Sequence, residues 1–327
     1  MTETLEQGLS RLQGRAVRIR ELRRVPCATA SSFRAERLGV TLDSGESLRV
    51  FFKNMHPDDL LAKARAVRGF DLEPSRREVR VYESILSPER FGTLVLYATR
   101  WEPEQGRVWI FLEDAGRGLL HNTRDLALWS SAARWAARFH AGTLDVPEDR
   151  GGFLPSLDVA HYRQVGARVR NLLPQLESRE RELVDRGLAI LDERLAWLCD
   201  LPRCVIHGQF FGRNIVLRSA SDLVVIDWET AARGPGLFDL VSLTSGSWTD
   251  SERRTMWAAY RDAYDQATGQ APPWEEFCAG LASVAVFHAL TWLAWWGEHR
   301  HLSRAFSRFL RELELVLTPA TGVRVWR

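Results

Sequence analysis

The period of the hydrophobic pattern changes once along this chain, close to residue 113. Before that point, short apolar runs alternate with polar residues, which is typical of half-buried strands. After it, apolar residues recur at three- and four-residue intervals, as they do over residues 128–139, which is typical of helices. The pattern predicts an α+β fold with a small β-rich N-terminal lobe, residues 1–113, and a larger helical C-terminal lobe, residues 114–327.

The N-terminal strands are expected to be short and separated by turns such as Asp43-Ser-Gly-Glu. One helix, with Val79, Tyr82 and Leu86 near one face, is expected among them at residues 77–86. The predicted strands are residues 16–22, 33–42, 48–53, 93–97 and 107–112. The predicted C-terminal helices are residues 128–139, 183–198 and most of residues 248–327.

Composition and charge exclude several classes of partner. The 44 basic residues nearly balance the 42 acidic residues and give a net charge of +2, so we expect no nucleic-acid partner. The longest apolar stretch, residues 281–296, contains Ser283, His288 and Thr291 and is short for a membrane span, so we expect a buried helix and no membrane partner. No signal peptide is evident and none of the four cysteines forms a C-x-x-C pair, which favours a cytoplasmic location.

Lysine is almost absent from the chain. Only Lys53 and Lys63 occur among the 44 basic residues, and the rest are arginine. Lys53 ends a predicted strand, and its retention in a chain that otherwise uses arginine indicates a specific role. Its ammonium is a compact charge on a flexible stem, which the planar guanidinium of arginine does not replace. The alternative is an ordinary surface lysine.

Residues 204–243 form the most informative segment of the sequence. Apolar runs at 215–217 and 223–226 flank a turn, which predicts a hairpin. Asn214 and Asp227 stand equally far from the middle of this turn, so pairing of the two arms should bring their side chains together at the open end. Amide and carboxylate oxygens are hard ligands that suit Mg²⁺. The alternative is an Asn cap and an Asp in an unremarkable loop.

The order H-G-x-x-x-x-x-N, then I-D-W-E, then G-P-G-L-F-D-L resembles the aminoglycoside phosphotransferase family, which includes choline kinase-like enzymes. The resemblance covers most of residues 16–245. It implies a protein-kinase-like bilobal fold and an ATP- or GTP-dependent, Mg²⁺-requiring transfer of phosphate to a hydroxyl group of an acceptor.

The resemblance also implies roles for individual residues. Lys53 would hold the α and β phosphates, and Glu78, or alternatively Glu83, would orient it. Asn214 and Asp227 would hold magnesium. The remaining implied roles concern support and a second metal. His207 would brace the loop formed by residues 207–214, and Asp239 would anchor this loop through backbone hydrogen bonds. Glu229 would reach a second metal or pair with an arginine.

The expected nucleotide pocket lacks a G-x-G-x-x-G loop. Residues 27–32 are small and polar instead, so Ser31 and Ser32 would bind phosphate with their backbone and hydroxyl groups, or the segment is a plain hairpin turn. The base would hydrogen-bond to the backbone near Glu113 and Asp114.

One position departs from the family pattern. Gln209 stands where the family has the aspartate that orients the acceptor hydroxyl and takes its proton, and a neutral amide can do only the first. Three alternatives remain open. The protein is a working phosphotransferase with an altered base. Alternatively, it is a non-catalytic pseudokinase that binds a nucleotide or metabolite as a regulatory or scaffold protein, with a protein as a possible partner. In the third alternative, it carries glutamine as an inactivating substitute for glutamate.

The acceptor is expected among the C-terminal helices. Residues 231–327 contain ten arginines and ten acidic residues, so this part lacks the acidic surplus that a polycationic aminoglycoside requires. A hydroxylated small molecule, a natural product or a peptide hydroxyl fits as well. Three aromatic residues either line an acceptor pocket or belong to the core: Trp292, Trp295 and Trp296.

Overall fold

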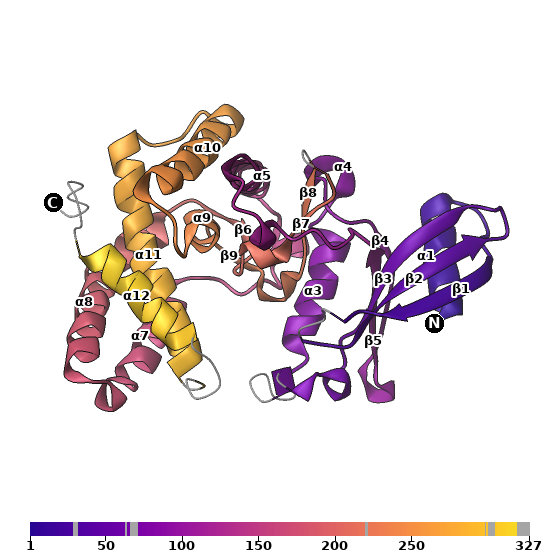
Figure 1. Cartoon of the computed structure of the whole chain (residues 1–327), viewed down its shortest axis with the longest axis horizontal. Helices are drawn as coiled ribbons and strands as arrows, with labels where there is room; N and C mark the ends of the chain where they lie inside the picture. Colours follow the sequence, from indigo (N-terminus) through magenta and orange to yellow (C-terminus); the bar gives the residue numbers. More distant parts are fainter. Residues whose placement is uncertain are drawn as a thin grey trace. The chain divides into compact units, whose positions relative to one another are not determined.

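We describe a computed structural model covering residues 1–28, 32–62, 64–65, 71–219, 222–297, 299 and 305–318. The described chain divides into two compact units. Unit 1 comprises Met1–Leu119 and Ile215–Thr230, and unit 2 comprises Leu120–Asn214 and Ala231–Arg327. The first unit is rich in strands and the second is mainly helical (Figure 1), so the predicted α+β class is confirmed.

Unit 1 is built on an antiparallel sheet with the strand order β1-β2-β3-β5-β4. Alternating apolar residues on β2 and β3 face a core that includes Leu38, Val40, Val50 and Phe52. The strands are β1 (Ile19–Pro26), β2 (Ala35–Leu42), β3 (Ser47–Asn54), β4 (Leu96–Glu102) and β5 (Arg107–Glu113), and the helices are α1 (Thr2–Gln13), α3 (Glu73–Ser84) and α4 (Pro88–Phe91).

Helix α1 was not predicted, although its sequence carries a signal. Leu5 and Leu9 lie four residues apart and are buried in the sheet's core, and Gly14 ends the helix with a φ of 65°. Gly8 allows α1 to pack closely on β4, because a Cβ at that position would lie 2.1 Å from the carbonyl oxygen of Tyr97.

The hairpin of β7 (Ile215–Leu217) and β8 (Leu223–Val225) belongs to unit 1, although it lies in the C-terminal half of the sequence. The N–H of Leu217 donates to the carbonyl of Gly118 at 2.6 Å, and Val216 bridges to Leu119. The predicted boundary at residue 113 therefore falls just before Gly118 and Leu119, the residues that pair with this hairpin.

The hairpin register differs from our expectation by one residue. Ile215 pairs with Val225 and Leu217 with Leu223, whereas the expected pairing of Asn214 with Asp227 needs Ile215 opposite Ile226. The reason is the loop, in which the N–H groups of Arg218 and Ser219 both donate to the carbonyl of Asp222 and make the turn asymmetric.

Unit 2 packs its helices around α11 (Trp274–Gly297). Helices α7, α8, α9 and α12 all contact α11 and share one apolar core. The elements are α5 (Leu126–Gly142), α6 (Glu148–Gly151), α7 (Val159–Arg170), α8 (Ser178–Asp200), β6 (Arg203–Ile206), β9 (Ala232–Pro235), α9 (Leu237–Thr244), α10 (Asp250–Thr268) and α12 (Ala305–Leu317).

Helix α11 is the helix of the described chain whose length and composition would suit a membrane span. Most of it is buried against its four neighbouring helices, and apolar residues occur all around it, as expected of a central core helix. The predicted buried helix at residues 281–296 is confirmed.

Candidate active site

A buried lysine and two carboxylates form the centre of unit 1. Nζ of Lys53 lies 2.9 Å from Oε2 of Glu78 and 3.0 Å from Oδ1 of Asp227. Lys53 is 8% exposed and Glu78 is 2% exposed. The three residues come from the end of β3, the middle of α3 and the residues that follow β8, so the tertiary fold brings them together from distant parts of the sequence.

The buried stripe of α3 sets the position of Glu78. Ser75, Glu78, Val79 and Tyr82 recur at helical spacing and are buried, and the Ser75 hydroxyl donates to the carbonyl of Met55 at 3.0 Å. Glu83 lies on another face of α3, where it accepts a hydrogen bond from the Thr99 hydroxyl at 2.7 Å. Of the two carboxylates considered from the sequence, Glu78 is the one that contacts Lys53.

Burial and charge oppose each other at this ion pair. Burial alone lowers the pKa of Lys53, but attraction to Asp227, then Glu78 and Glu229, outweighs it and raises that pKa. Burial raises the pKa of Glu78, against the opposing effect of Lys53. Lys53 therefore stays charged, and its charge depends on both carboxylates being nearby.

Asp227 has an unusual backbone. Its φ is 69°, in the left-handed region, where it is the sole non-glycine among the described residues. This conformation costs about 1–2 kcal/mol. The neighbouring Trp228 is fully buried, and its indole N–H donates to the carbonyl of Val225 at 3.1 Å, which fixes the turn. The fold thus stabilises a strained residue at the position that presents its carboxylate to Lys53.

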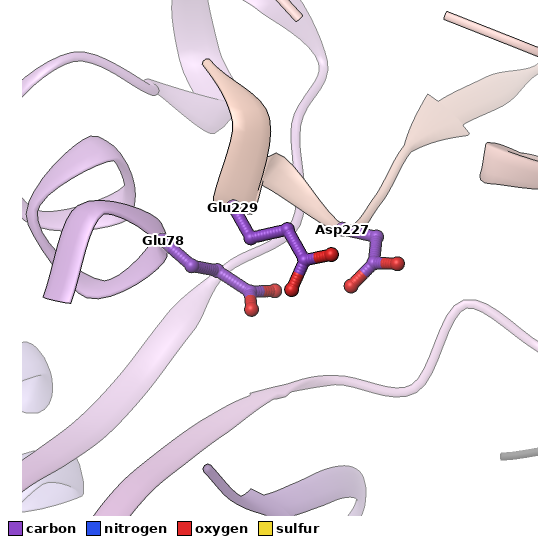
Figure 2. A group of neighbouring side chains, drawn as sticks. All are labelled: Glu78, Asp227 and Glu229. Atoms are coloured by element: carbon purple, nitrogen blue, oxygen red, sulfur yellow. The ribbon is translucent and has the colours of Figure 1, made fainter. Parts of the chain in front are cut away.

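Glu229 completes an acidic group. Single carboxylate oxygens of Glu78, Asp227 and Glu229 all lie within 4.8 Å of one another, and Figure 2 shows the three side chains converging. The backbone carbonyl of Glu229 also accepts a hydrogen bond from Arg77 at 2.8 Å. Asp227 is the most exposed of the three, so it is the carboxylate that is most accessible from solvent.

The loop formed by residues 207–214, which carries the H-G-x-x-x-x-x-N motif, lies in unit 2. Oδ2 of Asp239 accepts the N–H of His207 at 2.6 Å, and its Oδ1 accepts the N–H of Gly208 at 2.9 Å. Asp239 is 1% exposed, so these hydrogen bonds offset the cost of burying its charge. The backbone hydrogen bonds expected of Asp239 are therefore present.

Within the loop, Gln209 and Asn214 are joined through the backbone. Nδ2 of Asn214 donates to the carbonyl of Gln209 at 2.9 Å, and the N–H of Gln209 donates to Nδ1 of His207 at 3.2 Å. The side-chain amide of Gln209 forms no hydrogen bond with the described residues and is partly exposed. The loop thus has an ordered backbone, and the Gln209 side chain is a neutral amide.

Two residues that support this loop were not predicted. Nε2 of His140 lies 3.2 Å from Oδ2 of Asp239, and Nδ1 of His140 lies 2.9 Å from the hydroxyl of Tyr260. His140 comes from α5 and Tyr260 from α10, and both are buried. Nothing in the local sequence marks them, because their partners are about a hundred residues away.

The expected phosphate-binding serines are only partly described. Ser31 lies outside the described residues. Ser32 is partly buried, and its carbonyl accepts the N–H of Leu61 at 2.9 Å.

Hydrogen bonds inside the sheet restrict how the backbone near Glu113 and Asp114 could bind a base. The N–H of Glu113 donates to the carbonyl of Val95 at 2.9 Å, and the N–H of Asp114 donates to the carbonyl of Arg49 at 3.1 Å. The Asp114 carboxylate pairs with Arg37. These two N–H groups are thus already used inside the sheet and cannot bind a base.

The three tryptophans do not gather around one pocket. Trp292 stacks on Phe309 in the core, with ring centroids 5.5 Å apart, and its indole N–H donates to Nε2 of His288 at 3.0 Å. Trp296 also packs against the core, while Trp295 is 39% exposed. Burial of Trp292 and Trp296 favours the alternative of core residues over an acceptor pocket.

The geometry can be compared with known proteins. Residues 41–278, more than half of the chain, match the model of the phosphotransferase enzyme family. The chain belongs to this family. No curated protein sequence is significantly similar to it.

Several solved phosphotransferase structures are similar to this family member. The microcompartment-associated aminopropanol kinase has a TM-score of 0.58 and 15% identity over 90% of this chain and 91% of its own. Choline kinase LicA from Streptococcus pneumoniae has a TM-score of 0.56 and 14% identity, over 96% of this chain and 98% of its own. A thermostable mutant of aminoglycoside phosphotransferase APH(4)-Ia, solved with ADP and hygromycin B, has a TM-score of 0.54 and 12% identity, over 96% and 97%. At these identities the similarity shows the fold, which is the predicted protein-kinase-like one.

Proposed function

We propose that the protein binds ATP or GTP with Mg²⁺ and transfers the γ-phosphate slowly to a hydroxyl of a small molecule, natural product or peptide. The observation that carries the proposal is the buried contact of Lys53 with Glu78 and Asp227. Phosphoryl transfer depends mainly on positioning and on charge stabilisation, and a β-strand lysine paired with a helix glutamate is the arrangement that kinases use for this purpose.

Each nucleotide group finds a chemically suitable partner in this proposal. Lys53 would bind the phosphates as a fixed positive charge. The carboxylates of Asp227 and Glu229 are hard oxygen donors that fit Mg²⁺, which would neutralise the phosphate charge when bound. Asn214, which immediately precedes β7, stays the predicted amide ligand.

The backbone beyond β5 offers a refined site for the base. The N–H of Val95 donates to the side chain of Glu113 at 3.3 Å, and the described residues supply no donor to the Glu113 carbonyl or acceptor for the Ala115 N–H. An acceptor and a donor two residues apart match the donor and acceptor edge of a purine. We propose that these two groups bind the base.

Gln209 limits the chemical step. During transfer, the bond between the γ-phosphorus and the bridging oxygen breaks, and a bond from the acceptor oxygen to that phosphorus forms. The amide of Gln209 can orient the acceptor hydroxyl but cannot take its proton, which must pass to the transferred phosphoryl group or to water. Loss of a general base costs about 10²–10⁴-fold in rate.

A second candidate function is a pseudokinase that binds nucleotide and acts through a protein partner. The presence of Gln209 together with an ordered loop favours it. Both functions need the nucleotide site, and we propose a cytoplasmic location, in which the cysteine thiols would stay reduced.

A thermal-shift titration with ATP and GTP, with and without Mg²⁺, tests the shared part. We expect a Mg²⁺-dependent rise in Tm that disappears in Lys53→Ala and Asp227→Ala. No rise with either nucleotide would contradict both functions. Radiolabelled phosphate transfer to a panel of hydroxylated acceptors then separates the enzyme from the pseudokinase.

A further inference from the structure

A cavity of about 130 Å³ lies within unit 2, and none of its lining residues is assigned above to nucleotide binding. Its walls come from α5, α8, α9, α10 and α11 and from β6 and β9 (Figure 1). An apolar cavity of about 150 Å³ holds benzene, so this slightly smaller one is close to the size of a single ring.

The charge around the cavity restricts what can occupy it. Among the described residues that line it there is no lysine or arginine, and the ionised side chain is the carboxylate of Glu276. Glu276 is exposed on the first turn of α11, which places it where the cavity meets solvent. An anionic ligand would lose its hydration without gaining a positive partner, whereas a cation gains a carboxylate.

The buried end of the cavity is polar and supplies an acceptor. The Asp239 carboxylate only accepts hydrogen bonds, so Nε2 of the neutral His140 ring carries the proton, and Nδ1 accepts a hydrogen bond from the Tyr260 hydroxyl. The lone pairs on the Tyr260 oxygen stay available to a donor in the cavity. Both protons of the His140–Tyr260 pair are used in these two hydrogen bonds, so this pair offers no donor to a carboxylate or phosphate.

Aromatic rings form the sides. Tyr260 and Tyr264 stack with centroids 6.1 Å apart, and Tyr260 lies 6.2 Å from Phe277. Trp197 lines the cavity from α8, and its ring lies against Gly280 of α11. Such rings bind another ring by dispersion and attract a cation to their faces.

We propose that this cavity binds a small monocyclic aromatic amine, with the ring between Tyr264 and Phe277 and the ammonium facing Glu276. The cavity and the loop formed by residues 207–214 both belong to unit 2. At the buried end of the cavity, Tyr260 contacts His140, and His140 contacts the Asp239 carboxylate. Asp239 in turn accepts the backbone N–H groups of His207 and Gly208.

The test uses the full chain and three probes that differ in charge: 2-phenylethylamine, 2-phenylethanol and 3-phenylpropionate. Tm is measured in millimolar probe without nucleotide, so the result does not depend on the proposed phosphotransfer. We expect a Tm rise that is largest for the amine, smaller for the alcohol and absent for the acid. No rise with any probe, or an equal rise with the acid, would overturn the proposal.

A matched pair of variants tests the position. Glu275 and Glu276 are neighbouring exposed glutamates in the first turn of α11, and only Glu276 lines the cavity. Glu276→Gln should weaken amine binding about two- to fivefold, as expected for a partly exposed ion pair, and leave binding of the alcohol unchanged. Glu275→Gln should change neither. Equal effects of the two variants on amine binding would show that the amine binds elsewhere.

Discussion

Lys53 and Glu78 form a buried ion pair of 2.9 Å between β3 and α3. The pair is also joined by Asp227, so removal of one carboxylate leaves the ammonium with the other. A variant that lacks the Glu78 carboxylate therefore still pairs Lys53 with Asp227, so its nucleotide binding can be measured on a folded protein.

We predict that Glu78→Gln weakens ATP binding at least about tenfold while the protein stays folded. A hydrogen bond between charged groups contributes about 1.5–3 kcal/mol, and without it Lys53 is drawn toward Asp227 alone. The measurement is calorimetric titration with Mg²⁺ and ATP. Glu83→Gln is the matched control, because Glu83 contacts Thr99 on the other face of α3. Equal affinities of the two variants would contradict the proposed role of Glu78.

The local sequence predicts which secondary-structure elements carry the site residues, but not which residues of the hairpin lie opposite one another. The hairpin and the spacing of Asn214 and Asp227 were recognised, but the register was wrong by one residue. Register depends on how the carbonyl of Asp222 accepts two N–H groups in the loop, and apolar patterning does not encode that.

Contacts between distant segments were the least predictable. His140 and Tyr260 have no motif of their own, and they become visible only when α5 and α10 pack around Asp239. Trp292 shows the converse, because a row of tryptophans fits both a pocket and a core. Its stacking on Phe309 distinguishes the two, and no property of the tryptophan itself does.

Restoring a base at residue 209 should reveal the limit on the chemical step. We predict that Gln209→Asp raises the rate of nucleotide-dependent transfer or hydrolysis by about 10²–10⁴-fold, with little change in nucleotide affinity. Gln209→Glu is the companion variant with a longer carboxylate. Single-turnover release of labelled phosphate measures the step. If both variants match the parent rate while still binding nucleotide, the pseudokinase function is favoured.

Asp239 should be essential for the loop and for folding. Its three hydrogen-bonding partners, the N–H groups of His207 and Gly208 and Nε2–H of His140, are all donors. In Asp239→Asn, the amide NH₂ therefore faces a donor in either orientation. We predict a loss of at least about 1.5–3 kcal/mol in the free energy of unfolding, measured by urea denaturation. Asp185→Asn, at an exposed site on α8, should lose almost nothing, and similar losses in both variants would contradict this account.

His288 should make the protein less stable in acid. Burial, and then the charge of Arg308, lowers the pKa of His288 to about 3, against a weaker opposing effect of Asp239. Its Nε2 accepts the indole N–H of Trp292 at 3.0 Å and lies 2.9 Å from the Ser242 hydroxyl, so the native state favours the neutral ring.

The sign of this effect follows from proton uptake. The unfolded chain binds a proton at His288 below its ordinary pKa of about 6.5, and the native protein does so only near pH 3. The contribution is therefore complete above pH ~6.5 and decreases toward pH ~3, by up to about 1.4 kcal/mol per pH unit. We predict that His288→Gln, which keeps a polar group but does not titrate, shows a shallower decrease in unfolding free energy over this window. Urea denaturation of both proteins at several pH values measures it, and parallel curves would show that His288 does not carry the effect.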